Sequence, residues 1–212
     1  MIEFSNSDIS TGTGFFVKRV KSWGVDPKMI LDLGSDDGTT ARQLSWAWPE
    51  AQVFSYDPLN KADATEGNIS FFSKAVGRSN GECELKVVGN HTAESSVFEL
   101  VNGKTVDRRV FEVVRLEEHL AARGVTEVDL IFADIQGSEL NAFVGLGDVL
   151  GTVKWVQMEV CHKPLWHGSP LFEEIDWFMR AVGFELDFCT KMSRVGGVWG
   201  DAIFRKSGVE SA

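Results

Sequence analysis

The chain has 212 residues, of which 43% are hydrophobic and 25% charged, a balance typical of a globular protein that buries one sizeable core. Its net charge of −10 opposes binding to a nucleic-acid backbone, and no basic patch outweighs it. No window approaches eighteen uninterrupted apolar residues, and three widely spaced cysteines favour a reducing compartment. We therefore expect one cytoplasmic domain, residues 1–212, with no nucleic-acid and no membrane partner.

Helical and strand-like patterns alternate along the chain. Residues 15–23 have apolar side chains at helical spacing and predict a short N-terminal helical extension. A second helix is expected to follow a glycine turn and to end at Trp48, and further helices are expected over 116–123, 138–144 and 171–182. Strands are expected over 29–33, 51–57, 69–76, 81–88, 109–114, 128–134, 153–160, 184–189 and 198–204. This alternation predicts a three-layer α/β fold with a mostly parallel sheet. Residues 89–107 are polar and irregular, which is typical of a functional loop.

The first strand runs directly into a glycine turn that resembles a nucleotide site. Gly34 and Gly38 bracket this turn, where the backbone can approach a ligand closely. A dinucleotide fingerprint would need glycine at position 36, where this chain has Asp36. Carboxylates there repel a pyrophosphate but attract an ammonium group, so the turn favours S-adenosylmethionine. The candidate cofactor contacts in this segment are Asp32, Gly34, Ser35, Asp36, Gly38 and Thr39.

An acid followed by proline ends the second predicted strand. A carboxylate at this position in a doubly wound sheet lies beside the first turn and can accept both ribose hydroxyl protons. Asp57 is therefore the expected ribose ligand, and Pro58 stops the strand beside it. The alternative is that Asp57 only begins an Asp-Pro turn, and that Asp32 and Asp36 are solvated turn residues.

A later strand also ends in an acid, Asp134, which should face the same crevice. We expect Asp134 and His162 to converge on a second substrate bound beside the cofactor, one orienting its reacting group and the other removing a proton from it. His167 and His91 remain alternative bases, whereas His119 falls within a predicted helix. No metal ligand is expected. The alternative is a magnesium site formed by the acids Asp134, Glu139 and Glu159.

Several segments together resemble the FkbM-type methyltransferases of the class I S-adenosylmethionine-dependent superfamily. The similar segments are Leu31-Asp-Leu-Gly-Ser-Asp-Asp-Gly38, Asp57-Pro58, Ala75-Val-Gly77 with Gly81, Ser95-Ser96, and Val128-Asp-Leu-Ile-Phe-Ala-Asp-Ile-Gln-Gly-Ser-Glu-Leu140. The family commonly has a lysine two residues before the aspartate of the last motif, where this chain has Phe132 or Ala133. The resemblance implies a seven-stranded Rossmann-like sheet with its last strand antiparallel, and it adds Ala75 to the cofactor contacts.

The resemblance also implies methyl transfer from S-adenosylmethionine to a hydroxyl of a small molecule, such as a sugar or another natural product. Two alternatives of other classes stay open at this stage, an NAD-dependent oxidoreductase and a noncatalytic S-adenosylmethionine-binding protein. The identity of the acceptor and the question of a homo-oligomer lie beyond the sequence.

Overall fold

The computed structural model describes residues 12–59, 63–88, 91–101, 105–191 and 196–209. An eight-stranded sheet forms its centre, in the order β11-β12-β10-β9-β1-β2-β4-β3. The strands are β1 (Met29–Leu33), β2 (Gln52–Tyr56), β3 (Ala64–Glu66), β4 (Ile69–Phe72), β9 (Leu130–Ala133), β10 (Trp155–Cys161), β11 (Phe184–Cys189) and β12 (Trp199–Lys206).

The central strands are parallel and the two edges are not. β1 pairs in parallel with β2 and β9, β2 with β4, and β9 with β10. β12 runs antiparallel to both β10 and β11, which confirms the antiparallel last strand. β3 is an additional antiparallel edge strand of three exposed residues, which no apolar pattern in the sequence could have indicated.

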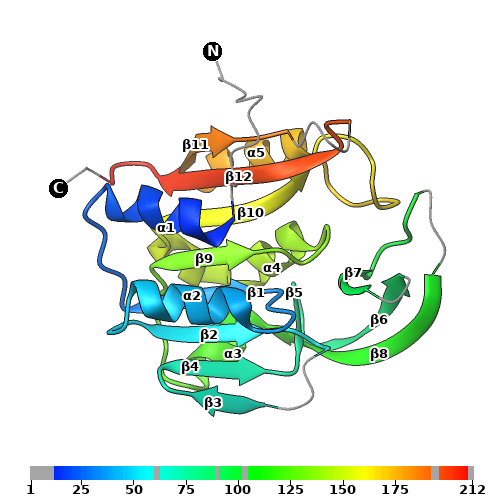
Figure 1. Cartoon of the computed structure of the whole chain (residues 1–212), viewed down its shortest axis with the longest axis horizontal. Coiled ribbons are helices and arrows are strands. Elements are labelled where there is room, and N and C mark those ends of the chain that lie inside the picture. Colours follow the sequence, from blue (N-terminus) through cyan, green and yellow to red (C-terminus); the bar gives the residue numbers. More distant parts are fainter. Residues whose placement is uncertain (1–11, 60–62, 89–90, 102–104, 192–195, 210–212) are drawn as a thin grey trace.

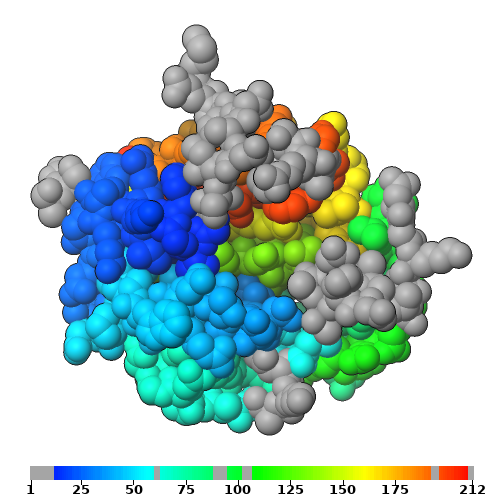
Figure 2. Space-filling model, viewed as in Figure 1, coloured from blue at the N-terminus to red at the C-terminus, as the bar shows by residue number. Residues whose placement is uncertain are grey.

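Helices cover both faces of this sheet. α1 (Thr13–Lys21) and α2 (Thr39–Ala47) lie on one face, and α3 (Leu116–Ala121), α4 (Glu139–Gly145), the 3-10 helix Gly147–Thr152 and α5 (Phe172–Ala181) on the other (Figure 1). The blue residues of α1 and α2 form much of the surface seen in Figure 2. α2 begins at Thr39, directly after Gly38, and Gly38 provides no side-chain cap. In the described part of the chain, no helix has the length and apolar character needed to cross a membrane.

Strand side chains alternate between two cores, as the period of a strand requires. In β1, Ile30 packs with the cluster beneath α1 and α2, which includes Phe16 and Leu44. Its neighbours Leu31 and Leu33 pack with the cluster beneath α3, α4 and α5. Because β1 is buried on both sides, its sequence is a continuous apolar run interrupted only by Asp32.

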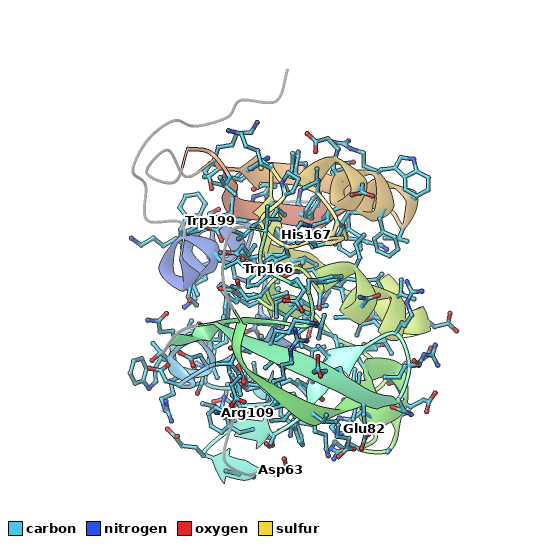
Figure 3. All side chains as sticks on the ribbon, turned by 90° about the vertical axis from the view of Figure 1, so that its right-hand side faces the viewer. Asp63, Glu82, Arg109, Trp166, His167 and Trp199 are labelled. Carbon is cyan, nitrogen blue, oxygen red and sulfur yellow. The ribbon has the colours of Figure 1, made fainter. Side chains whose placement is uncertain are left out.

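A second, four-stranded sheet faces the carboxyl ends of the parallel strands (Figure 1). It consists of β5 (Ala75–Gly77), β6 (Gly81–Val88), β7 (His91–Ser96) and β8 (Thr105–Arg115), in the order β5-β8-β6-β7. Figure 3 looks onto this edge, with Glu82 and Arg109 on the small sheet and Trp166, His167 and Trp199 above it. The expectation of an irregular loop over 89–107 was wrong where β7 and the start of β8 form, because pairing with β6 orders them.

Backbone hydrogen bonds fasten the small sheet to the segment after β10. The Val101 amide donates to the Leu165 carbonyl at 2.9 Å, and the His167 amide donates to the Glu99 carbonyl at 2.7 Å. Leu100 and Trp166 form an isolated antiparallel bridge between them. The small sheet is therefore held against the edge of the main sheet at which ligands bind in open α/β folds.

Candidate functional site

A cavity lies between the two sheets, at the carboxyl ends of β1, β2 and β9. The empty space between its walls is about 700 Å³, including the part open to solvent. Residues from both sheets form its wall: Gly34, Asp36, Tyr56, Asp57, Pro58, Leu59, Lys74, Ala75, Val76, Leu85, Ser95, Val97, Asp134, Ile135, Gln136 and Ser138. The sequence motifs after β1, β2 and β9 thus share one cavity.

Gly34 lets two backbone segments approach one another at the floor of the site. Its φ is +89°, and a Cβ at this position would lie 1.9 Å from the Asp134 carbonyl oxygen. Any residue with a Cβ at position 34 would therefore clash with the Asp134 backbone. The Gly34 amide donates to the Tyr56 carbonyl at 2.8 Å, so this residue joins the ends of β1, β2 and β9.

Asp57 follows β2 and is buried beside the glycine turn. One carboxylate oxygen, Oδ2, accepts from the Asp36 amide at 2.9 Å, and Oδ1 accepts from the Leu59 amide at 2.8 Å. Burial raises the pKa of Asp57, and these two amide hydrogen bonds oppose that shift. Each carboxylate oxygen has a second lone pair, which leaves capacity to accept from a ligand hydroxyl.

Asp36 has a left-handed backbone, with φ of +43°. Glycine adopts this conformation most readily, and aspartate is one of the few other residues that tolerate it. The turn therefore keeps the shape of a glycine turn while its exposed carboxylate lines the cavity. The carboxylate of a second acid, Asp37, accepts from the Thr39 amide at 2.9 Å and therefore lies at the N-terminus of α2.

Asp134 follows β9 on the opposite side of the cavity from Asp57. Asp134 is exposed to solvent and lines the cavity. Desolvation by the surrounding protein raises the pKa of Asp134 to about 6, a hydrogen bond from Gln136 opposes the shift, and the charge of Asp201 adds to it. At neutral pH such a carboxyl is mostly ionised and close to the pKa at which a general base is most effective.

Other acids extend across the same edge of the sheet. Glu159 lies opposite Asp201 in the β10–β12 pairing, and burial together with the charge of Asp134 raises its pKa well above the usual value. Glu139 accepts from the Ile135 and Gly137 amides through Oε1 and so supports the turn before α4. Among the described residues, no group of three or more histidine, cysteine or acidic side chains is arranged to hold a metal ion.

Five of the nine predicted cofactor contacts line the cavity, namely Gly34, Asp36, Asp57, Pro58 and Ala75. The other four, Asp32, Ser35, Gly38 and Thr39, do not line it. Asp32 is fully buried and accepts from the Ser55 hydroxyl at 3.0 Å, and burial raises its pKa to about 7. Ser35 and Gly38 belong to the turn after β1, and Thr39 is the first residue of α2.

His162 does not line the cavity, so the expected convergence with Asp134 is not found. Its amide donates to the Val198 carbonyl at 2.7 Å, which holds the chain after β10 against β12. Its Nε2 lies 2.8 Å from the Thr190 carbonyl, and its ring packs on Phe172. Because a carbonyl only accepts, Nε2 carries the proton. Burial lowers the pKa of His162, which keeps the ring neutral.

His167 and His119 are not among the residues that line the cavity. His167 is exposed, at the backbone contact with Glu99. His119, which the sequence excluded, lies on α3, where its Nδ1 is 2.9 Å from the Tyr56 hydroxyl, and burial lowers its pKa to about 4. His91 begins β7, and its side chain lies outside the described part of the chain.

Several wall residues were not predicted from the sequence. Lys74 directly precedes the predicted Ala75, and Gln136 lies within the family motif Val128–Leu140, but neither was predicted as a wall residue. Leu85 lies in β6 and Ser95 in β7, and Val97 directly follows β7. Their place on the wall depends on the packing of one sheet against the other, which no local pattern encodes.

This fold matches that of class I methyltransferases, and comparisons with known proteins define the family. The family model of the methyltransferase FkbM domain matches residues 32–186, so the chain belongs to the FkbM methyltransferase domain family. A 2-O-methyltransferase, NoeI of Sinorhizobium fredii (strain NBRC 101917 / NGR234), is 24% identical over 192 residues, covering 74% of this chain and 76% of that protein.

Solved structures show the same fold at low sequence identity. The methyltransferase FkbM from Methylobacillus flagellatus KT superposes with a TM-score of 0.53 and 11% identity, over 85% of this chain but only 44% of that one. Magnesium protoporphyrin IX methyltransferase (ChlM) from Synechocystis PCC 6803, solved with bound S-adenosylmethionine, gives a TM-score of 0.53 and 12% identity, over 92% of this chain and 78% of that one. The protein is thus a methyltransferase, which decides against the oxidoreductase alternative.

Proposed function

We propose that the protein transfers a methyl group from S-adenosylmethionine to a hydroxyl oxygen of a small molecule. The observation that carries this proposal is the shared cavity, which brings Gly34, Asp57 and Asp134 together from three strand ends. Methyl transfer to oxygen in the related NoeI, as its name states, supports an oxygen acceptor.

The wall of the cavity suits the charge of this cofactor. Asp36 and Asp57 stand on the side of β1 and β2, where they attract a cation and repel a phosphate. Asp57 would accept from the ribose hydroxyls, since its carboxylate retains lone pairs beyond the two amide contacts. Gly34 has no side chain and lines the cavity, so it would let the methionine part approach the floor of the site.

The chemistry requires an acceptor oxygen held in line with the sulfonium methyl. S-adenosylmethionine supplies the reactive methyl, and the protein supplies alignment and a base. Asp134 takes the second role in this proposal, because its carboxylate lines the cavity and its pKa is raised to about 6. His162 has no part in this proposal, since it is not among the residues that line the cavity.

The cofactor itself provides the first test. S-adenosylhomocysteine and S-adenosylmethionine should raise the melting temperature of the protein, whereas NAD should leave it unchanged, because a ligand stabilises the folded state that binds it. Differential scanning fluorimetry at several ligand concentrations measures this. Stabilisation by NAD without stabilisation by S-adenosylhomocysteine would refute the assignment.

Replacing Asp57 with alanine should weaken S-adenosylhomocysteine binding by roughly tenfold to a hundredfold, the effect of losing a hydrogen bond to a charged group. Isothermal titration calorimetry measures the affinity, and circular dichroism checks the fold. Asp26→Ala is a matched control, because Asp26 pairs with Lys28 on the exposed surface. An Asp57→Ala variant with unchanged affinity would place the ribose elsewhere.

A further inference from the structure

Gln136 holds one oxygen of the Asp134 carboxylate. Its Nε2 donates to Asp134 Oδ1 at 2.7 Å, and both residues line the cavity. An ionised carboxylate only accepts hydrogen bonds, so the amide must turn its NH2 group toward it. Among the described side chains, Gln136 is the only hydrogen-bond partner of this carboxylate, which leaves Oδ2 with its lone pairs for a molecule in the cavity.

The backbone of Gln136 is held in a conformation that a glutamine rarely adopts. Its φ is +52°, in the left-handed region. The Ser96 hydroxyl donates to the Gln136 carbonyl at 2.7 Å, and Glu139 accepts from the amides on both sides of Gln136. Such a strained conformation persists only where the surroundings impose it, and it clusters at functional sites. Here contacts from the small sheet and from α4 impose it.

We propose that Gln136 is a positioning residue, which fixes the Asp134 carboxylate with Oδ2 toward the methyl acceptor and stabilises its ionised form. This inference rests on the proposed role of Asp134 as the base. Gln136 would act through Asp134 and would not itself bind cofactor or acceptor.

The acidic charges around the Asp134 carboxylate oppose its ionised form. The acids that interact with Asp134 come from β1, the β1–α2 turn, the end of β2, α4, β10 and β12, and are Asp32, Asp36, Asp57, Glu139, Glu159 and Asp201. The nearby cation on the wall, Lys74, pairs with Glu112 at 2.5 Å. Burial and these acids favour the protonated form of Asp134, and the Gln136 amide opposes them.

The test measures the titration of Asp134 directly, by carbon-13 NMR of the side-chain carboxyl in the unliganded protein, with its signal identified by its loss in Asp134→Asn. Two variants remove the amide. Gln136→Met keeps the length of the side chain, and Gln136→Gly accepts the left-handed backbone without strain, so that at least one should fold. Gln52→Met, on the exposed start of β2, is the matched control.

In both Gln136 variants we expect the titration midpoint of Asp134 to rise by about one pH unit, while S-adenosylhomocysteine affinity stays within about twofold of the wild type. The control should leave both unchanged. A titration midpoint that stays unchanged in both variants would overturn the proposal. If S-adenosylhomocysteine affinity also fell tenfold in those variants, Gln136 would be a cofactor contact instead. The titration needs neither cofactor nor acceptor, so a failure of the proposed function would be seen separately, as absent ligand binding by the wild type.

Discussion

Replacing Asp134 with asparagine is expected to lower kcat by about 10²–10⁴-fold, the usual contribution of a general base. Asparagine has the same shape and can still accept from Gln136, so the fold and cofactor affinity should persist. The measurement is S-adenosylhomocysteine formation with a panel of hydroxylated acceptors, beside calorimetric titration of the cofactor product. A fall in kcat without a change in affinity identifies an interaction made in the chemical step.

His162 provides the contrast for this experiment. His162→Ala should keep kcat within a few-fold of the wild type, because the imidazole contacts Thr190 and Phe172 and does not line the cavity. The pH profile gives a second comparison. A base is active only when ionised, so the activity of the wild type should fall as the pH drops through about 6, the raised pKa of Asp134. Full activity of Asp134→Asn, with loss of activity in His162→Ala, would reverse the assignment.

Gly34→Ala is expected to destabilise the protein by about 2–5 kcal/mol, combining a left-handed backbone with overpacking. The added Cβ would lie 1.9 Å from the Asp134 carbonyl oxygen and 2.7 Å from its carbon, and backbone atoms cannot rotate away as a side chain can. Thermal unfolding should show a melting temperature lowered by roughly 10 °C. S-adenosylhomocysteine affinity should also fall, because the floor of the cavity must shift.

Gly14 offers a matched control for this substitution. It lies in α1, and a Cβ there would meet no atom of the described residues within 4 Å. Gly14→Ala should therefore leave the melting temperature unchanged or slightly higher, since alanine favours a helix. Equal melting temperatures of the two variants would show that the contact between the ends of β1 and β9 is looser than the structure indicates.

The parallel half of the main sheet could be predicted from the sequence because its strands are buried on both faces. Such strands are continuous apolar runs that end in glycine or acids, as at Gly34, Asp57 and Asp134. The rule that ligands bind at the carboxyl ends of parallel strands then placed these residues together. The family motifs added Ala75, which also lines the cavity.

The small sheet and the fate of His162 could not be predicted in this way. β7 and the start of β8 are polar strands, ordered by pairing with β6. A strand end predicts only the edge at which a side chain lies, and the chain after β10 turns toward β12 instead of the cavity. Local patterns likewise cannot separate Asp36, which faces the cavity, from Asp32, which hydrogen-bonds Ser55 in the core.

The most direct test of the account is a crystal structure of the protein with S-adenosylhomocysteine. We expect the ribose hydroxyls within hydrogen-bond distance of Asp57, and the sulfur directed toward the side of the cavity that carries Asp134. Binding outside this cavity, or binding within it with the sulfur turned away from Asp134, would contradict the proposed mechanism.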